Sequence, residues 1–366
     1  MKFSINQSEL QNALSVVQKG IATRSTLPIL SGIYLEAAQD KLTLQATDLE
    51  LSIQYTVPAL IEEEGKSVFP GKLFSDIVKN LPDAAVHAET AEDSAIITCD
   101  TSSFSIKTLD ADDFPGFPQV DTEQTISIPF SQFSSMVKRV ARVVSKDESR
   151  AILTGVLITL EGETLKMVAT DSYRLAITET KLNDPSADGF QAVIAGSFLQ
   201  ELASLPRTDD ALTIALAENQ IVVTYHDTVF INRRIEGNFP NYRQLLPDSY
   251  STRVKINVEH LVSGVKRTSI MGLQSSPVKF SIDTDSQTIQ LSAAAQDVGS
   301  AQETISCAGE GDSVDIAFNY SYVLDGLTSV EDDDVYLEVQ SGMKPGIFKA
   351  AGKENYLYLV MPVRLS

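Results

Sequence analysis

Apolar residues recur at the spacing i, i+3, i+4 and i+7 in three long segments of the chain, with polar residues between them. In the first segment Leu10, Ala13, Leu14 and Val17 would share one face, which is typical of an amphipathic helix packed on a core. A short strand with alternating polarity precedes each segment. The predicted helices are Glu9–Lys19, Gln132–Ser145 and Glu259–Ile270, and the strands are Lys2–Ile5, Thr125–Ile128 and Arg253–Asn257.

Much of the remaining chain alternates between apolar and polar residues with period two, as strands with one buried face do. Clear cases are Lys41–Ala46, Thr164–Val168 and Thr288–Ser292. Each third of the chain also contains a second, shorter helical pattern. These shorter helices are predicted at Lys72–Asn80, Ser197–Ser204 and Tyr320–Ser329.

The pattern repeats along the chain. Gly32 and Gly155 lie 123 positions apart, and Asp48 and Asp171 end matching Ala-Thr-Asp triplets at the same offset. Two further landmarks keep nearly this offset, namely Leu81-Pro82 with Leu205-Pro206 and Phe114-Pro115 with Phe239-Pro240. The third copy has diverged but keeps the order of strand, helix, strands and helix. A threefold internal repeat accounts for all of these features.

The fold class predicted from these elements is α+β, with helices on one face of antiparallel sheet. Polar connectors at Asp121–Gln124 and Pro247–Thr252 mark the boundaries between copies. We therefore expect three domains, at residues 1–122, 123–249 and 250–366.

Composition narrows the class of protein. The 366 residues are 43% hydrophobic and 21% charged, so the chain can bury a large core and is neither a disordered tail nor a disulfide scaffold. Cys99 and Cys307 are too far apart in sequence for a CxxC metal site and are expected to be buried. No segment has the apolar length of a signal peptide or a membrane span, so a cytoplasmic protein without membrane contact is expected.

The formal net charge of −20 argues at first against a nucleic-acid partner. The charge is unevenly distributed, however. Six windows that contain the predicted helices (8–24, 72–80, 131–150, 197–207, 259–271 and 319–331) carry a net charge of +4, and the rest of the chain carries −24. Repeated helices on one side of a sheet would give a mildly basic surface that suits a polyanion.

The second copy carries the clearest basic stripe. On a helical wheel continued through residue 150, its basic residues fall within 120° of one another and opposite an apolar face that includes Met136 and Val140. A solvated face of an ordinary amphipathic helix is the alternative for any one helix. The stripe consists of Lys138, Arg139, Arg142, Lys146 and Arg150.

Catalytic and metal-binding signatures are missing from the sequence. There is no P-loop, HExxH or GxSxG motif, and His87, His226 and His260 are dispersed. Asp48 and Asp171 occupy equivalent repeat positions, which favours a structural role over paired catalytic carboxylates. We expect a scaffold or binding module with no catalytic residues, no metal and no cofactor.

Several motifs together resemble one family, the bacterial DNA polymerase sliding clamps, which are beta subunits of the DNA polymerase III holoenzyme. The resemblance covers the whole chain, and the combination of ATDxxRL with a C-terminal MPxRL is its most specific part. The matching motifs are Arg24–Leu30, Arg150–Val156, Val168–Leu175, Gly237–Tyr242 and Met361–Leu365.

The resemblance implies three clamp-type domains per chain and a ring-shaped head-to-tail homodimer, with sheets outside and two helices of each domain inside. It implies non-specific binding of double-stranded DNA in the ring. The implied partners are the replicative polymerase alpha subunit, the clamp loader, and other polymerases and repair proteins that carry clamp-binding peptides.

The resemblance assigns DNA contacts to Arg24, Lys72, Lys146 and Arg150. The helical wheel adds Lys138, Arg139 and Arg142, together with Lys266 and Arg267. The chain departs from the family pattern at Ala151, Ile152 and Gln244, where the family example has two tyrosines and a basic residue, so template stacking there is not expected.

A pocket between copies two and three is implied to bind a short peptide with a glutamine and two large apolar anchors. Apolar walls would bury the anchors, and a few polar groups would orient the peptide. The matching residues are Leu153, Thr170, Tyr173, Arg174, Leu175, Pro240, Leu245, Met343, Pro345, Leu359, Val360, Met361, Pro362, Val363 and Arg364.

The subunit contact is implied to join an edge strand at Phe104–Leu109 of copy one to copy three. Phe104, Ile106 and Ile270 are the predicted apolar contacts. The basic residues that precede this strand in the family example are replaced by Thr101, Ser102 and Ser103. Two other classes remain as alternatives: a non-catalytic repeat adhesin or binding protein, and an enzyme with an unrecognised carboxylate site.

Overall fold

A computed structural model describes residues 1–22, 25–122, 124–182, 189–206, 208, 210–271, 277–295, 299–352 and 355–364. Within these ranges, no helix is both long enough and apolar enough to cross a membrane. The chain divides into two compact units. Unit 1 comprises Met1–Phe130 with Leu205–Arg234, and unit 2 comprises Ser131–Ser204 with Ile235–Ser366.

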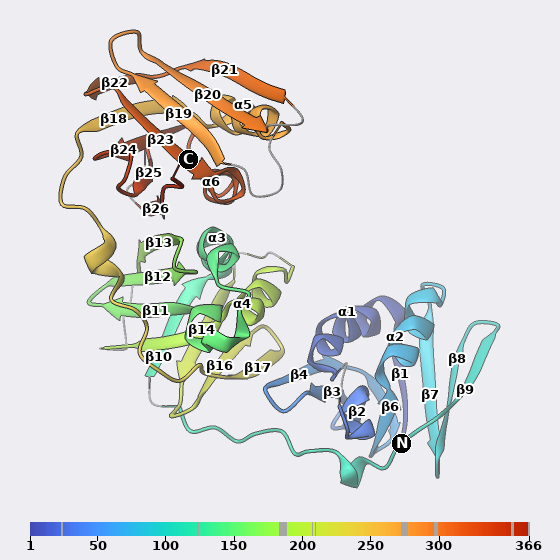
Figure 1. Cartoon of the computed structure of the whole chain (residues 1–366). Helices are drawn as coiled ribbons and strands as arrows, with labels where there is room; N and C mark the ends of the chain where they lie inside the picture. Colours follow the sequence, from blue (N-terminus) through green and yellow to red (C-terminus); the bar gives the residue numbers. More distant parts are fainter. Residues whose placement is uncertain are drawn as a thin grey trace. The chain divides into compact units, whose positions relative to one another are not determined.

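The threefold repeat is confirmed, because each copy has the same order of elements: one strand, a helix, four strands, a helix and three strands (Figure 1). Copy one also has the short extra strand β5 (Leu60–Glu63), and copy three has β22 (Ala308–Gly311). The elements of copy one are β1 (Lys2–Asn6), α1 (Gln7–Val17), β2 (Gly32–Ala38), β3 (Lys41–Thr47), β4 (Leu51–Pro58), β6 (Gly65–Pro70), α2 (Gly71–Asn80), β7 (Ala85–Ala91), β8 (Ser94–Cys99) and β9 (Ser102–Lys107).

Copies two and three follow the same order. Copy two contains β10 (Gln124–Pro129), α3 (Phe130–Val140), β11 (Gly155–Glu161), β12 (Thr164–Thr170), β13 (Arg174–Lys181), β14 (Gln191–Ala195), α4 (Gly196–Ala203), β15 (Ala211–Leu216), β16 (Gln220–Tyr225) and β17 (Thr228–Arg233). Copy three contains β18 (Thr252–Asn257), α5 (Val258–Ser269), β19 (Pro277–Asp283), β20 (Thr288–Ala295), β21 (Gly299–Ser306), β23 (Val314–Asn319), α6 (Tyr320–Leu327), β24 (Asp334–Val339), β25 (Gly346–Ala350) and β26 (Tyr356–Val360).

Antiparallel sheets continue from one copy into the next. In unit 1, an eight-stranded sheet has the order β10-β15-β16-β17-β4-β3-β2-β6, and a five-stranded sheet has the order β5-β1-β7-β8-β9. In unit 2, a nine-stranded sheet has the order β14-β11-β12-β13-β26-β25-β24-β18-β22, and a four-stranded sheet has the order β21-β20-β19-β23. The β4–β17 and β13–β26 pairs are therefore the seams between copies.

Local sequence explains where the helices begin. An asparagine side chain caps α1, α5 and α6 by accepting a hydrogen bond from a backbone N–H of the first turn, at Asn6, Asn257 and Asn319. The apolar face of each helix is buried, as the periodicity predicts, and α1 packs on α2 as α5 packs on α6. Helices thus cover one side of the strands in each copy.

The predicted helix Gln132–Ser145 is too long. Helix α3 ends at Val140 and is followed by the short 3₁₀ turn η4 (Ala141–Val143). A second 3₁₀ segment, η5 (Glu148–Thr154), has a non-helical backbone at Arg150. A single wheel therefore describes Lys138 but not Lys146 or Arg150.

Candidate functional site

An apolar cluster occupies one face of the nine-stranded sheet at the seam between copies two and three. Its centre is the cross-strand pair of Leu175 on β13 and Leu359 on β26, both buried. Neighbouring strands extend it through Leu157, Val168, Ile177, Val193 and Ile347. The linker between the copies packs on this cluster through Phe239, Tyr242 and Leu246.

Four large apolar side chains are exposed in the segments that adjoin the strands and the linker of this cluster. Met361 follows β26, and its backbone N–H donates to the carbonyl of Tyr173 at 2.9 Å. Leu245 lies in the linker and Met343 in the turn before β25. The exposed fractions of Tyr173, Leu245, Met343 and Met361 are 59%, 47%, 62% and 40%. The ring of Tyr173 stacks with that of Tyr322 on α6, with 6.5 Å between the ring centres. We call the other three residues and the buried pair Leu175 and Leu359 the seam surface. An exposed apolar surface of this kind is typical of a partner-binding site.

Arg174 lies on the other face of β13 from Leu175, because successive side chains of a strand point to opposite sides. Its guanidinium contacts Asp171 at 2.9 Å and Asp325 on α6 at 2.5 Å, and it donates to the carbonyl of Arg142 at 3.2 Å. It also lies over the ring of Tyr322 at 4.4 Å. Arg174 therefore lies on the helix side, where it holds the seam together and lines a hollow with Arg142 and Lys146. Its contact with a peptide stays a prediction.

Electrostatics keep this network charged. Burial by itself would lower the pKa of Arg174, but the phenol of Tyr358 and the carboxylates of Asp325 and Asp171 together raise it. Burial raises the pKa of Tyr358, which remains a neutral phenol that donates to the carbonyl of Tyr322 at 2.8 Å. The turn that carries Tyr173 is thereby fixed to α6 of copy three.

The other residues predicted for the peptide site are divided between the two faces and the chain end. Thr170 is buried and donates to the carbonyl of Arg174, and Val360 pairs with Arg174 on the helix side. Leu153 is buried, while Pro240 is exposed in the linker. Beyond Met361, the backbone N–H of Val363 bonds to Ala317. Pro345 and Pro362 are partly buried, and Arg364 is exposed.

Comparison with known proteins now identifies the family. Models of the N-terminal, central and C-terminal domains of the DNA polymerase III beta subunit match residues 1–118, 127–241 and 243–364. A beta sliding clamp from Synechocystis is 32% identical over the full length of both chains. The chain belongs to the DNA polymerase III beta subunits, the sliding clamps.

Solved clamp structures agree with this assignment over the full length of both chains. The sliding clamp of Bacillus subtilis has a TM-score of 0.96 at 30% identity, and a Pseudomonas aeruginosa clamp bound to griselimycin has a TM-score of 0.94 at 27% identity. Sliding clamps are processivity factors, and the predicted family, fold class and function of this chain are confirmed. Among the residues that the structure describes, no cluster of side chains could hold a metal ion.

Basic residues predicted to face DNA in this clamp differ in how available they are. Lys72, Lys138, Lys146 and Lys266 are exposed, and none forms an ion pair within the described part of the chain. Arg142 donates to Thr328 at 2.7 Å. Arg24 lies outside the described residues.

Three further arginines are already paired. Arg150 contacts Asp147 at 3.4 Å and donates to Ser172 at 3.0 Å. Arg267 on α5 contacts Glu303 on β21 at 2.5 Å. The predicted exposure of Arg139 is wrong: only 6% of this residue is exposed, and it forms an ion pair with Glu331 at 2.8 Å. A wheel of copy two cannot reveal this partner because Glu331 belongs to copy three.

The predicted edge strand of copy one is found as β9, although its bounds are Ser102–Lys107 rather than Phe104–Leu109. Phe104 is 39% exposed and Ile270 is 74% exposed, as an apolar contact with another chain requires. Ile106 is only 7% exposed, so its predicted role as a contact is corrected to a core residue.

Sequence reasoning missed the residues that support the site from a distance. Tyr322 and Asp325 on α6 hold Arg174, and no local motif marks them. Phe239 and Tyr242 pack on the apolar cluster. Their signal was present, since both belong to the motif Gly237–Tyr242 that carries part of the family resemblance. Ile152, a departure from the family pattern, also packs on this cluster, while Gln244 is exposed.

Proposed function

We propose that two copies of this chain close head to tail into a ring around double-stranded DNA. The observation that carries the proposal is a pairing rule among equivalent strands. The third strand after the first helix of each copy is β4, β13 or β21. The last strand of each copy is β9, β17 or β26. Within the chain, β4 pairs with β17 and β13 pairs with β26.

Because the third strands pair with the last strands of the neighbouring copy, one third strand and one last strand have no such partner within the chain and lie at sheet edges. β9 ends the five-stranded sheet, and β21 ends the four-stranded sheet. An open edge presents unpaired N–H and carbonyl groups that favour pairing with another chain. Pairing β9 of one chain with β21 of a second chain, and the reverse, would give six seams of one type and satisfy both edges. Phe104 and Ile270 are the exposed apolar residues available to support this contact.

The ring would retain DNA by topology and not by strong binding. Four exposed lysines (Lys72, Lys138, Lys146 and Lys266) offer non-specific phosphate contacts, which carry no sequence information. Several of the arginines are engaged with carboxylates, so the number of phosphate contacts is small. Few weak contacts permit movement along the duplex, and the strongly negative remainder of the chain disfavours DNA elsewhere. No catalytic step is required of the protein.

The seam surface is proposed as the binding site for peptides of the replicative polymerase, the clamp loader and other polymerases or repair proteins. At the equivalent seam of copies one and two, Ser52 faces Ile231 where Leu175 faces Leu359 in unit 2. Ser52 is bonded to Thr47 at 2.9 Å. The first seam therefore lacks a leucine pair, which favours one peptide site per chain. Work at the replication fork implies a cytoplasmic location.

Loading on circular DNA tests the ring. The chain would be loaded on a nicked circle by a clamp loader, separated from free protein and then treated with a nuclease that linearises half of the sample. We expect retention on the circle and release from the linear DNA. Equal retention on both would contradict topological binding, and equal loss from both would contradict a closed ring.

A further inference from the structure

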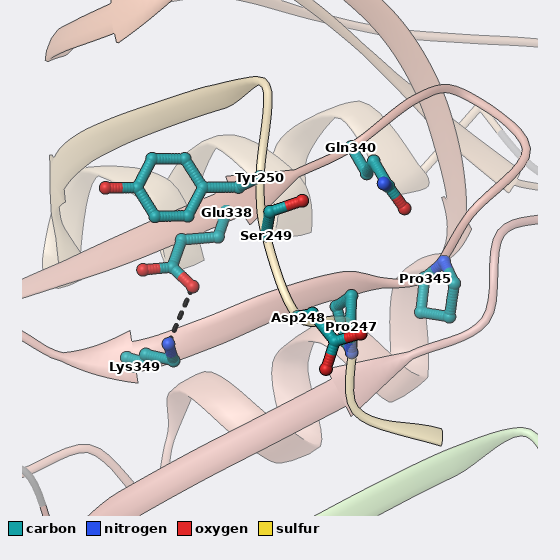
Figure 2. A pocket seen from close by; sticks show the side chains of 8 residues that line it. All are labelled: Pro247, Asp248, Ser249, Tyr250, Glu338, Gln340, Pro345 and Lys349. Atoms are coloured by element: carbon teal, nitrogen blue, oxygen red, sulfur yellow. Dashed lines mark ion pairs between the residues drawn. The ribbon is translucent and has the colours of Figure 1, made fainter. Parts of the chain in front are cut away.

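A hollow of about 340 Å³ adjoins the seam surface on the same face of the nine-stranded sheet, between the linker that joins copies two and three and strands β24 and β25 (Figure 2). The linker contributes Pro247, Asp248 and Tyr250, and the strand side contributes Glu338, Pro345 and Lys349. Two chain segments connect the hollow directly to the seam surface. Leu245 precedes Pro247 by two residues, and Met343 precedes Pro345 by two residues.

The register of the sheet explains this continuity. Glu338 pairs with Ile347, which belongs to the apolar cluster of the seam, so both side chains lie on one face. Pro345 and Lys349 share that face, because they are two residues from Ile347 in either direction. A peptide that covers the seam surface would therefore reach the hollow without leaving this face of the sheet.

Glu338 and Lys349, the two charged residues that line the strand side of the hollow, balance each other. The side chain of Glu338 is 7% exposed, and its carboxylate contacts Lys349 at 2.7 Å and Arg253 at 3.4 Å. The guanidinium of Arg253 in turn lies 3.9 Å from the ring centre of Tyr336. Lys349 is committed to Glu338. Arg253 does not line the hollow and also lies 5.7 Å from the ring centre of Tyr250, so it is held between the sheet and the linker and offers no free site for an anion.

Asp248 also lines the hollow, and its negative charge is not paired with a cation in the described part of the chain. It is exposed and forms neither an ion pair nor a hydrogen bond within the described part of the chain. Tyr250, Pro247 and Pro345 provide apolar and aromatic walls beside it, and Gln340 adds an amide. A long cationic side chain fits such walls, because its alkyl stem packs on apolar surface while its charged end meets a carboxylate.

We propose that this hollow, which we call the flank pocket, binds a lysine or arginine side chain that flanks the apolar anchors of a partner peptide. The proposal rests on the proposed peptide-binding role of the seam surface and adds a charge preference to it. The net charge of −20 works in the same direction, because it attracts cationic peptides at long range.

A comparison of three peptides tests the flank pocket on the full chain. Each peptide carries the same glutamine and two large apolar anchors, with lysine, alanine or glutamate at flanking positions, and a fourth peptide replaces both anchors by alanine. Affinities would be measured by fluorescence polarisation against the native chain, Asp248→Asn and Asp248→Lys. Asp227→Asn is the matched control, because it removes one exposed charge from unit 1, far along the chain from the hollow.

We expect the native chain to bind the lysine peptide about threefold more tightly than the alanine peptide, as one exposed ion pair allows. Asp248→Asn should abolish this preference, Asp248→Lys should shift it to the glutamate peptide, and Asp227→Asn should preserve it. A lysine preference that persists in Asp248→Asn, or an equal loss of affinity for all three peptides, would overturn the flank pocket.

The same experiment separates this proposal from the one on which it depends. If the anchored peptides bind and the anchorless peptide does not, the seam surface is supported whatever the flanking residue does. If flanking charge then has no effect, only the flank pocket fails. If the anchored peptides bind no better than the anchorless one, both proposals fail.

Discussion

Arg174 and Leu175 are neighbours in sequence, yet they serve opposite faces of the sheet that joins copies two and three. Leu175 pairs with Leu359 in the apolar cluster, while Arg174 reaches Asp325 and Tyr322 on the helix side. One strand thus carries both the proposed partner surface and the network that fixes it. Variants on the two faces should therefore have different consequences.

On the partner face, Met361→Ala and Leu245→Ala should each weaken binding of an anchored peptide by about tenfold, the cost of removing an apolar contact in a small interface. Both residues are only about half-buried, so the melting temperature should change little. Titration of a labelled peptide measures the effect. Leu49→Ala removes an exposed leucine from the turn between β3 and β4 in unit 1 and should leave affinity unchanged. Equal affinities for all variants would contradict the seam surface.

On the helix face, Arg174→Ala should destabilise unit 2 by roughly 3 kcal/mol, because it leaves Asp171 with little solvent access and no cation. Arg174→Lys keeps the charge but cannot bond several partners at once, so it should be intermediate. Thermal melting measures the loss. Peptide affinity should fall with stability in this series, since the arginine positions the turn of Tyr173. A melting temperature equal to that of the native chain would contradict this role.

The contrast between these two faces shows which features the sequence contains. Matched landmarks such as Asp48 and Asp171 revealed the repeat because they are local signals that recur in order. The partners of Arg139 and Arg174 could not be found in this way. Glu331 and Asp325 lie more than 150 positions away and meet these arginines only when β13 pairs with β26.

Ile106 illustrates a second limit. Alternation in β9 identifies a strand, but it does not say which end of the strand is covered. Phe104 and Ile106 point to the same face of β9, where they pair with Ile97 and Ala95 of β8. Only Phe104 is exposed. Coverage depends on the packing of the rest of copy one, which a local pattern does not contain.

The open edges lead to a prediction about assembly. The native chain should have a solution mass of about 80 kDa, that of two 39.8-kDa chains. Phe104→Asp or Ile270→Asp should shift the mass to that of one chain, because each buries a charge in the proposed contact. Light scattering coupled to gel filtration measures the mass. Leu60→Asp, at an exposed position of β5, is the control and should remain a dimer. A dimer that survives both interface variants would contradict the β9–β21 contact.

The buried tyrosines predict a loss of stability in alkali. Burial raises the pKa of Tyr358 and of Tyr356 above the ordinary value of 10.0. The unfolded chain therefore releases these protons at lower pH than the folded chain does, so stability is intact below about pH 10 and falls as pH rises above it. Tyr358→Phe should make this decline shallower in melting curves between pH 8 and 11. Tyr250→Phe, at an exposed tyrosine, should not.

Glu303 holds Arg267 in an ion pair, so a change of Glu303 should alter DNA binding by Arg267. The Arg267 side chain is bonded to Glu303, and this bond lowers the pKa of the Glu303 carboxyl, which stays ionised at neutral pH and holds the arginine. Glu303→Gln should release Arg267 for phosphate contact. We expect tighter binding to a short duplex and a salt dependence steeper by about one phosphate contact.

The matched control for this effect is Glu92→Gln, which removes the same charge from an exposed turn between β7 and β8. If only net charge matters, both variants should bind DNA equally well. If release of Arg267 is the cause, Glu303→Gln should bind more tightly than Glu92→Gln, and adding Arg267→Ala to Glu303→Gln should remove the gain. Fluorescence anisotropy at several salt concentrations distinguishes the two, and a gain that persists in the double variant would contradict the role of Arg267.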